Sequence, residues 1–97
     1  MGTKPETRIV NAIMRDLRSR GAWCFKVHGG PFQASGIPDI VGCIGGAFFG
    51  IEVKVAGGKA TELQELTLRR IREAGGRGGV ATSVEEAREV VGLGEEA

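Results

Sequence analysis

Apolar residues recur at helical spacing in the first part of the chain, before Gly21. They fall on one face of a helix and comprise Ile9, Val10, Ile13, Met14 and Leu17. Gly21 favours a helix end at this point. The start, Thr3-Lys4-Pro5-Glu6, matches a capping box, in which the acidic side chain satisfies backbone N–H groups. The pattern therefore predicts a first helix over residues 3–20.

Three short apolar runs follow and predict strands. Residues 22–28 alternate, so that Trp23, Phe25 and Val27 share one face, while Cys24, Lys26 and His28 share the other. Residues 40–50 form an apolar run that Gly45-Gly46 interrupts, which is typical of a β-hairpin. A further short strand is expected over residues 78–82.

A second helix is expected over residues 61–74, where Gly75-Gly76 follows. Thr61 and Gln64 have capping-box spacing, and the residues expected to point inward are Leu63, Leu66, Ile71 and Ala74. Ser83 opens a final helix with the same spacing to Glu86. The elements then run α-β-β-β-α-β-α, which predicts an α/β fold with a small mixed β-sheet flanked by helices.

Length and composition indicate one small domain over residues 1–97, in which residues 92–97 are expected to fray. At 41% hydrophobic and 26% charged residues, the composition is that of an ordinary soluble protein. No apolar stretch is long enough to cross a membrane and no signal peptide is visible, which favours the cytoplasm. Cys24 and Cys43 lack metal-ligand spacing and are expected to be buried, reduced thiols.

The formal net charge of +1 conceals an asymmetry along the chain. Residues 1–81 contain twelve Lys and Arg against seven Asp and Glu, whereas residues 82–97 contain one Arg and five Glu. The larger part is therefore basic, and its surface is suited to a polyanionic partner such as nucleic acid.

Two carboxylates and one amine meet in the predicted hairpin. Asp39 stands at the start of its first strand, and Glu52 and Lys54 lie two residues apart near the end of its second strand. Antiparallel pairing brings these positions together. Two adjacent carboxylates repel each other unless a cation lies between them, and oxygen ligands favour Mg²⁺ or Mn²⁺. The alternative is a Glu–Lys pair on a solvated strand, with Asp39 capping a turn.

A hard metal ion at this position would suit phosphodiester hydrolysis, because it lowers the pKa of a bound water and stabilises charge on phosphorus oxygens. Lys54 would then orient or deprotonate the attacking water, or neutralise the transition state. A nucleotide triphosphatase is disfavoured, because the glycines before Lys59 lack the P-loop pattern.

The motifs Ser35-Gly36-Ile37-Pro38-Asp39 and Ile51-Glu52-Val53-Lys54, followed by Gln64 in a helix, resemble the VRR-NUC family of the PD-(D/E)xK nuclease superfamily. The resemblance extends over about residues 6–91. It implies a restriction-endonuclease-like fold, with Asp39, Glu52 and the backbone carbonyl of Val53 as metal ligands and Lys54 as the catalytic lysine. It also implies site roles for Glu6 and Gln64.

Two of these residues have a structural alternative. Glu6 and Gln64 each occupy the last position of a capping box, so either side chain could serve its helix instead of the site. Lys26 and His28 share a strand face that could be the side of the site, and contacts with DNA are expected from Lys26, Ser35, Lys59 and Arg69. The single histidine, His28, is expected to be a surface or substrate-contacting group, because hard-metal sites do not favour imidazole.

The resemblance implies a Mg²⁺- or Mn²⁺-dependent DNA endonuclease that leaves a 5′-phosphate. Compact phage-encoded members of the family suggest a homodimer, and two sites related by a two-fold axis suit branched DNA such as a four-way junction. The sequence contains no base-reading element, so preference for DNA structure is expected. A DNA-binding module without catalysis and an RNA endonuclease are the alternatives.

Overall fold

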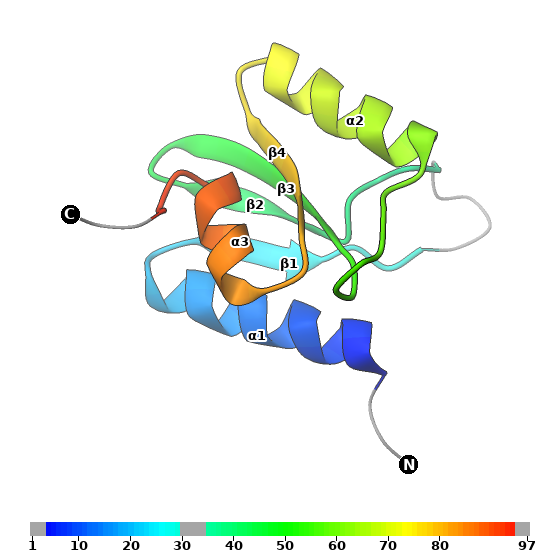
Figure 1. The fold of residues 1–97 in the computed structure, drawn as a ribbon. Coiled ribbons are helices and arrows are strands. Elements are labelled where there is room, and N and C mark those ends of the chain that lie inside the picture. Colours follow the sequence, from blue (N-terminus) through cyan, green and yellow to red (C-terminus); the bar gives the residue numbers. More distant parts are fainter. Residues whose placement is uncertain (1–3, 30–34, 95–97) are drawn as a thin grey trace.

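A computed structural model describes residues 4–29 and 35–94. Its elements run α-β-β-β-α-β-α along the chain, as the sequence predicts (Figure 1). In order they are α1 (Pro5–Ser19), β1 (Trp23–Lys26), β2 (Ile40–Ile44), β3 (Ala47–Val53), α2 (Glu62–Glu73), β4 (Arg77–Ala81) and α3 (Val84–Val90). The bounds of α1, β1, α2 and β4 lie within two residues of those expected, and β3 extends to Val53, three residues beyond the expected apolar run.

The four strands form one mixed sheet in the order β1-β2-β3-β4. β1 pairs antiparallel with β2 and β2 with β3, while β3 and β4 are parallel. The β2–β3 hairpin turns at Gly45 and Gly46, whose φ angles are 58° and 83°. Two consecutive positive φ angles match the twist of a tight hairpin and favour glycine. This arrangement confirms the predicted α/β fold.

One face of the sheet packs against α1 and α3, which lie on the same side of it (Figure 1). The buried residues of this core are Val10, Ile13 and Leu17 from α1, Cys24, Ile40, Phe49, Ile51, Val53 and Ala81 from the strands, and Ala87 and Val91 from the α3 region. Asp16 of α1 accepts two hydrogen bonds from the guanidinium of Arg88 in α3, at 2.7 and 3.0 Å. The two helices are therefore joined by polar as well as apolar contacts.

Helix α2 packs on the opposite face, over β3 and β4 (Figure 1). Glycines allow this close approach, because a Cβ at Gly50 would lie 2.8 Å from Ile71 and one at Gly78 would lie 2.8 Å from the Leu68 carbonyl oxygen. The same face remains exposed over β1, where Trp23 is 69% and Phe25 45% exposed. One helix thus covers only half of this face.

The inward face predicted for the second helix is wrong in part. Leu68 is the buried residue of α2, whereas Leu63 is 45% exposed and Ala74 is also exposed. Leu66 and Ile71 are half-buried. The helix approaches the sheet at Leu68 and Ile71, where the Ile71 side chain lies against both glycines on β3 and β4 and the Leu68 backbone lies against Gly78.

The capping boxes expected at the starts of the three helices differ in how far they form. α1 begins after Lys4, which makes no side-chain cap bond, and Thr3 lies outside the described residues. α2 has the full capping box between Thr61 and Gln64. At α3, Ser83 accepts from the Glu86 N–H, but the Glu86 carboxylate bonds Thr82 in place of the Ser83 backbone.

The prediction for the cysteines is wrong at one of the two positions. Cys24 is buried, but Cys43 is exposed, and both thiols are free. Cys43 lies beside Trp23 and Phe48 in the register of the strands, on the face that α2 leaves partly uncovered. Among the described residues, no helix is both long and apolar enough to cross a membrane.

Candidate active site

Asp39 immediately precedes β2, and its side chain accepts a backbone hydrogen bond from the end of β3. Its backbone oxygen accepts a hydrogen bond from the Val27 N–H at 2.8 Å, which continues the pairing of β1. Its carboxylate Oδ2 accepts from the Val53 N–H at 2.8 Å. The carboxylate is thus held at the end of β3, next to Glu52 and Lys54.

Glu52 is a buried carboxylate whose hydrogen bonding is incomplete. It is 3% exposed, and one of its oxygens, Oε2, lies 3.6 Å from Lys54 Nζ. The other oxygen, Oε1, is buried and has no hydrogen-bond partner. A buried, unpaired carboxylate oxygen is costly in a metal-free protein, and a cation would relieve that cost.

The electrostatics of Glu52 indicate the same need for positive charge. Burial first, and then the negative charge of Asp39 and a hydrogen bond with its carboxyl group, together raise the pKa of Glu52 from 4.5 to about 7. Lys54 acts against this rise without cancelling it. One lysine is therefore too little positive charge for the two carboxylates.

The backbone of Val53 is directed toward Asp39. The next N–H along β3, that of Lys54, donates to the Ala81 oxygen on the β4 side at 3.0 Å, and the Val53 N–H donates to Asp39 on the other side. In a strand the N–H and C=O of one residue point to the same side. The Val53 carbonyl is therefore directed to the side on which Asp39 lies. Two carboxylates and a carbonyl are oxygen donors of the kind that hard divalent cations accept.

Glu6 does not join these two carboxylates in the structure. It is exposed in the first turn of α1. Across residues 4–29 and 35–94, no three His, Cys, Asp or Glu side chains lie close enough to form a metal-binding group. The site role that the resemblance implies for Glu6 stays a prediction.

Gln64 caps α2. Its Oε1 accepts from the Thr61 N–H at 2.9 Å, and its own N–H donates to Thr61 Oγ1 at 3.2 Å. The side chain of Gln64 therefore serves its helix as a cap, which is the structural alternative to a role in the site. The cap uses only the oxygen of the amide, so a site role would depend on the Nε2 group.

The residues expected to contact DNA are dispersed. Lys26 lies at the same end of the sheet as Asp39, but its register with Ile40 and Ile51 places it on the α1 face, opposite Glu52 and Lys54. The expectation that Lys26 and the site share a face is therefore wrong. Three further residues are exposed on loops or on α2, namely Ser35, Lys59 and Arg69, and His28 is also exposed.

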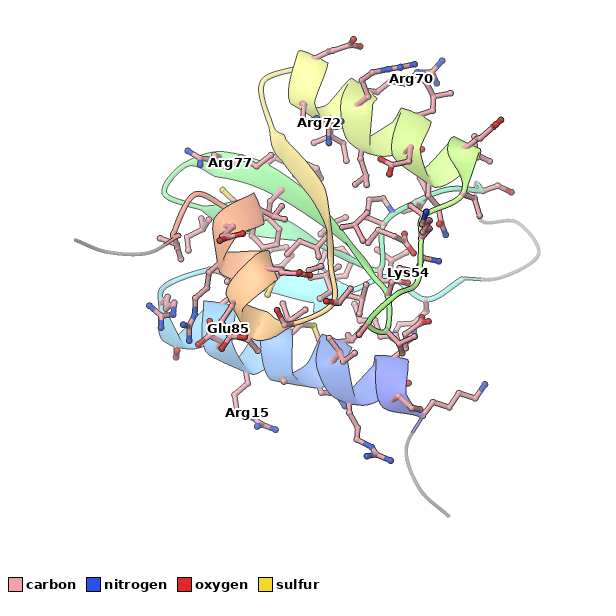
Figure 2. The ribbon with its side chains drawn as sticks, in the orientation of Figure 1. Arg15, Lys54, Arg70, Arg72, Arg77 and Glu85 are labelled. Atoms are coloured by element: carbon pink, nitrogen blue, oxygen red, sulfur yellow. The ribbon has the colours of Figure 1, made fainter. Side chains whose placement is uncertain are left out.

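Figure 2 shows Lys54 beside the connection from β3 to α2, while Arg70 and Arg72 project from α2 and Arg77 lies at the start of β4. A hollow of about 690 Å³ lies along α2, lined by Ala60, Glu62, Leu63, Glu65, Leu66, Arg69 and Arg72. Its lining does not include Asp39 or Glu52. We place the candidate site at Asp39 and Glu52 because charge and donor type, and not volume, define a metal site.

The sequence reasoning missed this hollow and the role of Arg72. Arg72 Nη1 donates to the Gly78 carbonyl oxygen at 2.8 Å, so this arginine ties α2 to β4. The three-residue spacing of Arg69 and Arg72 was the available signal, since residues three apart share a helix face. The spacing alone does not show which arginine contacts β4 and which is exposed to solvent, because it does not contain the position of β4.

No family model matches the sequence, and no curated protein sequence matches it either. Solved structures do resemble the fold. A structure titled "VRR_NUC domain" superposes with a TM-score of 0.75 and 21% identity, covering 92% of this chain and 96% of the other. The Archaeoglobus fulgidus Holliday junction resolvase Hjc superposes with a TM-score of 0.60 and 25% identity, covering 77% of this chain and 65% of the resolvase.

These neighbours confirm a restriction-endonuclease-like fold. They are consistent with the VRR-NUC family of the PD-(D/E)xK superfamily, to which the motifs at Asp39 and at Glu52-Val53-Lys54 are similar.

Proposed function

We propose that the chain is a divalent-metal-dependent DNA endonuclease that acts on branched DNA, with the four-way junction as its preferred substrate. The observation that carries the proposal is the buried Glu52 carboxylate, whose Oε1 has no partner and which lies beside Asp39 and Lys54. A surface ion pair with no further purpose would be exposed and complete, because an unpaired buried oxygen is unfavourable.

Asp39, Glu52 and the Val53 carbonyl would hold Mg²⁺ or Mn²⁺. Their donor atoms are all oxygen, and the two carboxylates carry more negative charge than Lys54 neutralises. When bound, the ion supplies an activated water and stabilises negative charge on the phosphate that is attacked. Glu6 is a candidate for an additional carboxylate, from the first turn of α1.

The remaining site residues would orient the attacking water and neutralise charge on the phosphate. Lys54 Nζ is held by Glu52 Oε2, and we assign it to orienting the attacking water and neutralising charge on the phosphate oxygens. Gln64 would donate its Nε2 group to the same water or phosphate while its oxygen caps α2. Contacts with more distant phosphates would come from the exposed or half-buried polar residues Lys26, Ser35, Lys59 and Arg69.

The substrate class is supported by the structural neighbours and by charge. One neighbour is titled a Holliday junction resolvase, and residues 1–81 have a basic balance that suits a polyanion. A homodimer would present two identical sites to a substrate with two-fold symmetry. These points favour paired cuts in branched DNA.

The test is cleavage of a labelled four-way junction beside a linear duplex and a single strand of matched sequence. Each is incubated with Mg²⁺, Mn²⁺ or EDTA, using wild type, Lys54→Ala and, as a matched control, Lys4→Ala, which removes an exposed lysine. We expect cutting in Mg²⁺ or Mn²⁺ only, fastest for the junction, retained by Lys4→Ala and lost in Lys54→Ala by at least about a hundredfold.

Two outcomes contradict the proposal. Junction binding with no cutting in any metal would identify a DNA-binding module without catalysis. Faster cutting of an RNA of the same structure would identify an RNA endonuclease, since the 2′-OH is the group by which a protein distinguishes the two.

A further inference from the structure

The chain makes a tight turn over residues 55–58, directly after Lys54 at the end of β3. The Gly58 N–H donates to the Val55 carbonyl oxygen at 2.8 Å and closes this turn. Gly57 has a φ angle of 85°, whereas the φ angle of Ala56 is not positive. These angles are those of a type II turn, whose third residue has a positive φ angle and is usually glycine. The backbone conformation of the turn therefore accounts for the glycine at residue 57.

The glycine at residue 58 has a different physical reason. Its φ angle lies outside the left-handed region, so its backbone conformation does not require glycine. A Cβ at this position would lie 3.0 Å from the Val55 carbonyl oxygen and 3.2 Å from Lys54 Cβ, closer than the 3.4–4 Å of an ordinary contact. A side chain at residue 58 would thus press on the first carbon of the lysine side chain. The turn needs the empty space beside Lys54.

Lys54 is held at three points along its length. Its N–H donates to the Ala81 carbonyl oxygen at 3.0 Å, which fixes its backbone to β4. Its Nζ lies 3.6 Å from Glu52 Oε2 at the other end. Gly58 lies against the Cβ between these two points. The side chain is only 19% exposed, although it belongs to the connection that leaves the sheet (Figure 2).

We propose that Gly58 is a positioning residue for Lys54. Its close approach sets the direction in which the lysine side chain leaves the end of β3, and thereby the place of the Nζ group beside Glu52. A lysine carries its charge at the end of a flexible carbon chain, so a displacement at Cβ is passed on to the amine. In an active site, a group misplaced by ~1 Å can cost about a hundredfold in rate.

This inference rests on the proposed function, in which Lys54 orients the attacking water and neutralises charge on the phosphate. The three atoms nearest to a Cβ at Gly58 belong to Val55 and Lys54. A methyl group there would therefore displace the lysine and leave the proposed metal ligands, Asp39 and Glu52, in place. The expected signature is a slower cleavage step with unchanged substrate and metal affinities.

The test compares the kinetics of junction cleavage by wild type, Gly58→Ala and the matched control Gly94→Ala. The control adds the same methyl group after α3, at an ordinary contact distance of 3.7 Å from Glu89 Cγ. We expect kcat to fall by at least about tenfold in Gly58→Ala, with KM within about twofold of wild type, and no change in Gly94→Ala. Circular dichroism and urea unfolding check that each variant is folded.

A double-mutant cycle with Lys54→Ala tests whether Gly58 acts through the lysine. Once the amine is removed, Gly58→Ala should change the residual rate by no more than about twofold. Equal fold losses in the wild-type and Lys54→Ala backgrounds would show that residue 58 acts independently of the lysine, and would overturn the proposal. Calorimetric titration of Mg²⁺ should give wild type and Gly58→Ala the same affinity within about twofold.

The place of the Lys54 amine also has a readout that needs no cleavage. In carbon–proton NMR spectra of the metal-free protein, the Lys54 Cε signal is identified by its absence from Lys54→Ala. In wild type it should differ from the signal of Lys4, which is exposed, because Lys54 lies beside Glu52. Gly58→Ala should move the Lys54 signal toward that of Lys4, and Gly94→Ala should leave it unchanged.

A Gly58→Ala protein with the kcat of wild type would overturn the proposal. So would a raised KM with unchanged kcat, because Gly58 would then serve the close approach of the DNA backbone. If wild type cuts no DNA while Gly58→Ala moves the Lys54 signal, the positioning contact stands and the proposed function fails. If wild type cuts the junction while Gly58→Ala changes neither kcat nor the signal, the proposed function stands and the positioning role fails.

Discussion

Glu52 shows most clearly how burial and chemistry are related at the scale of single residues. Its position on β3 places it under the α2 side of the sheet, where it is 3% exposed. Asp39 is fixed nearby by the Val53 N–H, so the two carboxylates cannot move apart freely. Lys54 satisfies one Glu52 oxygen and leaves the other unpartnered. The metal-free site is thus under electrostatic strain that a cation would remove.

This strain predicts a pH-dependent stability for the metal-free protein. The pKa of Glu52 is raised from 4.5 to about 7, so folding favours its protonated form. The unfavourable contribution is absent below the unfolded-state value and complete above the folded-state value. Glu52→Gln should therefore stabilise the protein on the order of 2 kcal/mol at about pH 8 and have little effect at about pH 4.

Urea unfolding in EDTA at the two pH values measures this difference. Glu65→Gln, which neutralises an exposed glutamate on α2, is the matched control and should change little at either pH. A Glu52→Gln variant that is equally destabilised at both pH values would show that the carboxylate has a structural role.

The amide of Gln64 predicts a separation between stability and activity. Gln64→Glu keeps an oxygen that can accept from the Thr61 N–H, so the unfolding free energy should remain within about 0.5 kcal/mol of wild type. It lacks the Nε2 donor that we assign to the attacking water or the phosphate and puts a negative charge in its place, so junction cleavage should fall by about tenfold or more. Unchanged cleavage in this variant would limit Gln64 to its cap.

At the scale of elements, two faces of one sheet are packed in different ways. The α1–α3 face is closed by large aliphatic side chains. The α2 face relies on glycines that admit the helix to β3 and β4 and leaves the aromatic residues of β1 uncovered. Asp16 ties α1 to α3, accepting from Arg88 and also from Arg20 at 3.2 Å.

The Asp16 ion pairs predict a loss of stability in acid. The Arg88 guanidinium, with Arg20, holds the pKa of Asp16 below its ordinary value of 3.8. A lowered pKa stabilises the fold above the unfolded-state value, and that contribution is lost as the pH falls through the folded-state value. Asp16→Asn should therefore cost roughly 1 kcal/mol near neutral pH, because the pair is partly exposed.

The difference between Asp16→Asn and wild type should shrink as the pH falls below 3.8, because the wild-type carboxylate becomes protonated as the pH passes through its lowered pKa. Thermal unfolding across this pH range provides the measurement, with Glu73→Gln on α2 as a control of equal charge change. A difference that persists in acid would assign the effect to packing.

The order of elements could be predicted because its signals are local. Gly45-Gly46 marks the hairpin, and Thr61 with Gln64 marks the start of α2. The exposure of Trp23 and Phe25 could not be predicted in this way, because alternation along β1 is the same whether or not a helix covers it. Lys26 was assigned to the wrong face for a related reason. Its face is fixed by its register with Ile40, which no local pattern contains.

The candidate site was predictable only at its centre. Asp39, Glu52 and Lys54 are joined by a hairpin whose register follows from its turn, so their proximity follows from sequence. Glu6 is on a helix that packs across the sheet, and its distance from the carboxylates depends on the docking of α1. The sequence does not determine that docking to within the length of a side chain.

At the scale of the whole molecule, the proposed function calls for two sites in one assembly. A homodimer would carry two carboxylate–lysine groups, and the basic balance of residues 1–81 would attract the DNA backbone to them. A single chain of this size could act on one strand at a time. The pairing of sites would therefore determine the kind of product.

This arrangement predicts the products from a plasmid that extrudes a cruciform. Wild type should linearise it, because both strands are cut within one binding event. Wild type mixed with an about tenfold excess of Lys54→Ala should mainly nick it, with the ratio of linear to nicked product lowered by at least about fivefold, since a mixed dimer carries one active site. Agarose gel analysis at matched total cleavage distinguishes the two products. Equal ratios with and without the Lys54→Ala protein would contradict paired cutting by a dimer.

The most direct test of the central claim, that Asp39 and Glu52 hold a divalent cation, is calorimetric titration of Mg²⁺ and Mn²⁺ into the protein without DNA. Wild type and Lys54→Ala should both bind, because the lysine is not a ligand. Asp39→Asn and Glu52→Gln, which retain shape and remove charge, should lose binding by at least about tenfold. Absence of binding to wild type, or equal binding by all four proteins, would contradict the account.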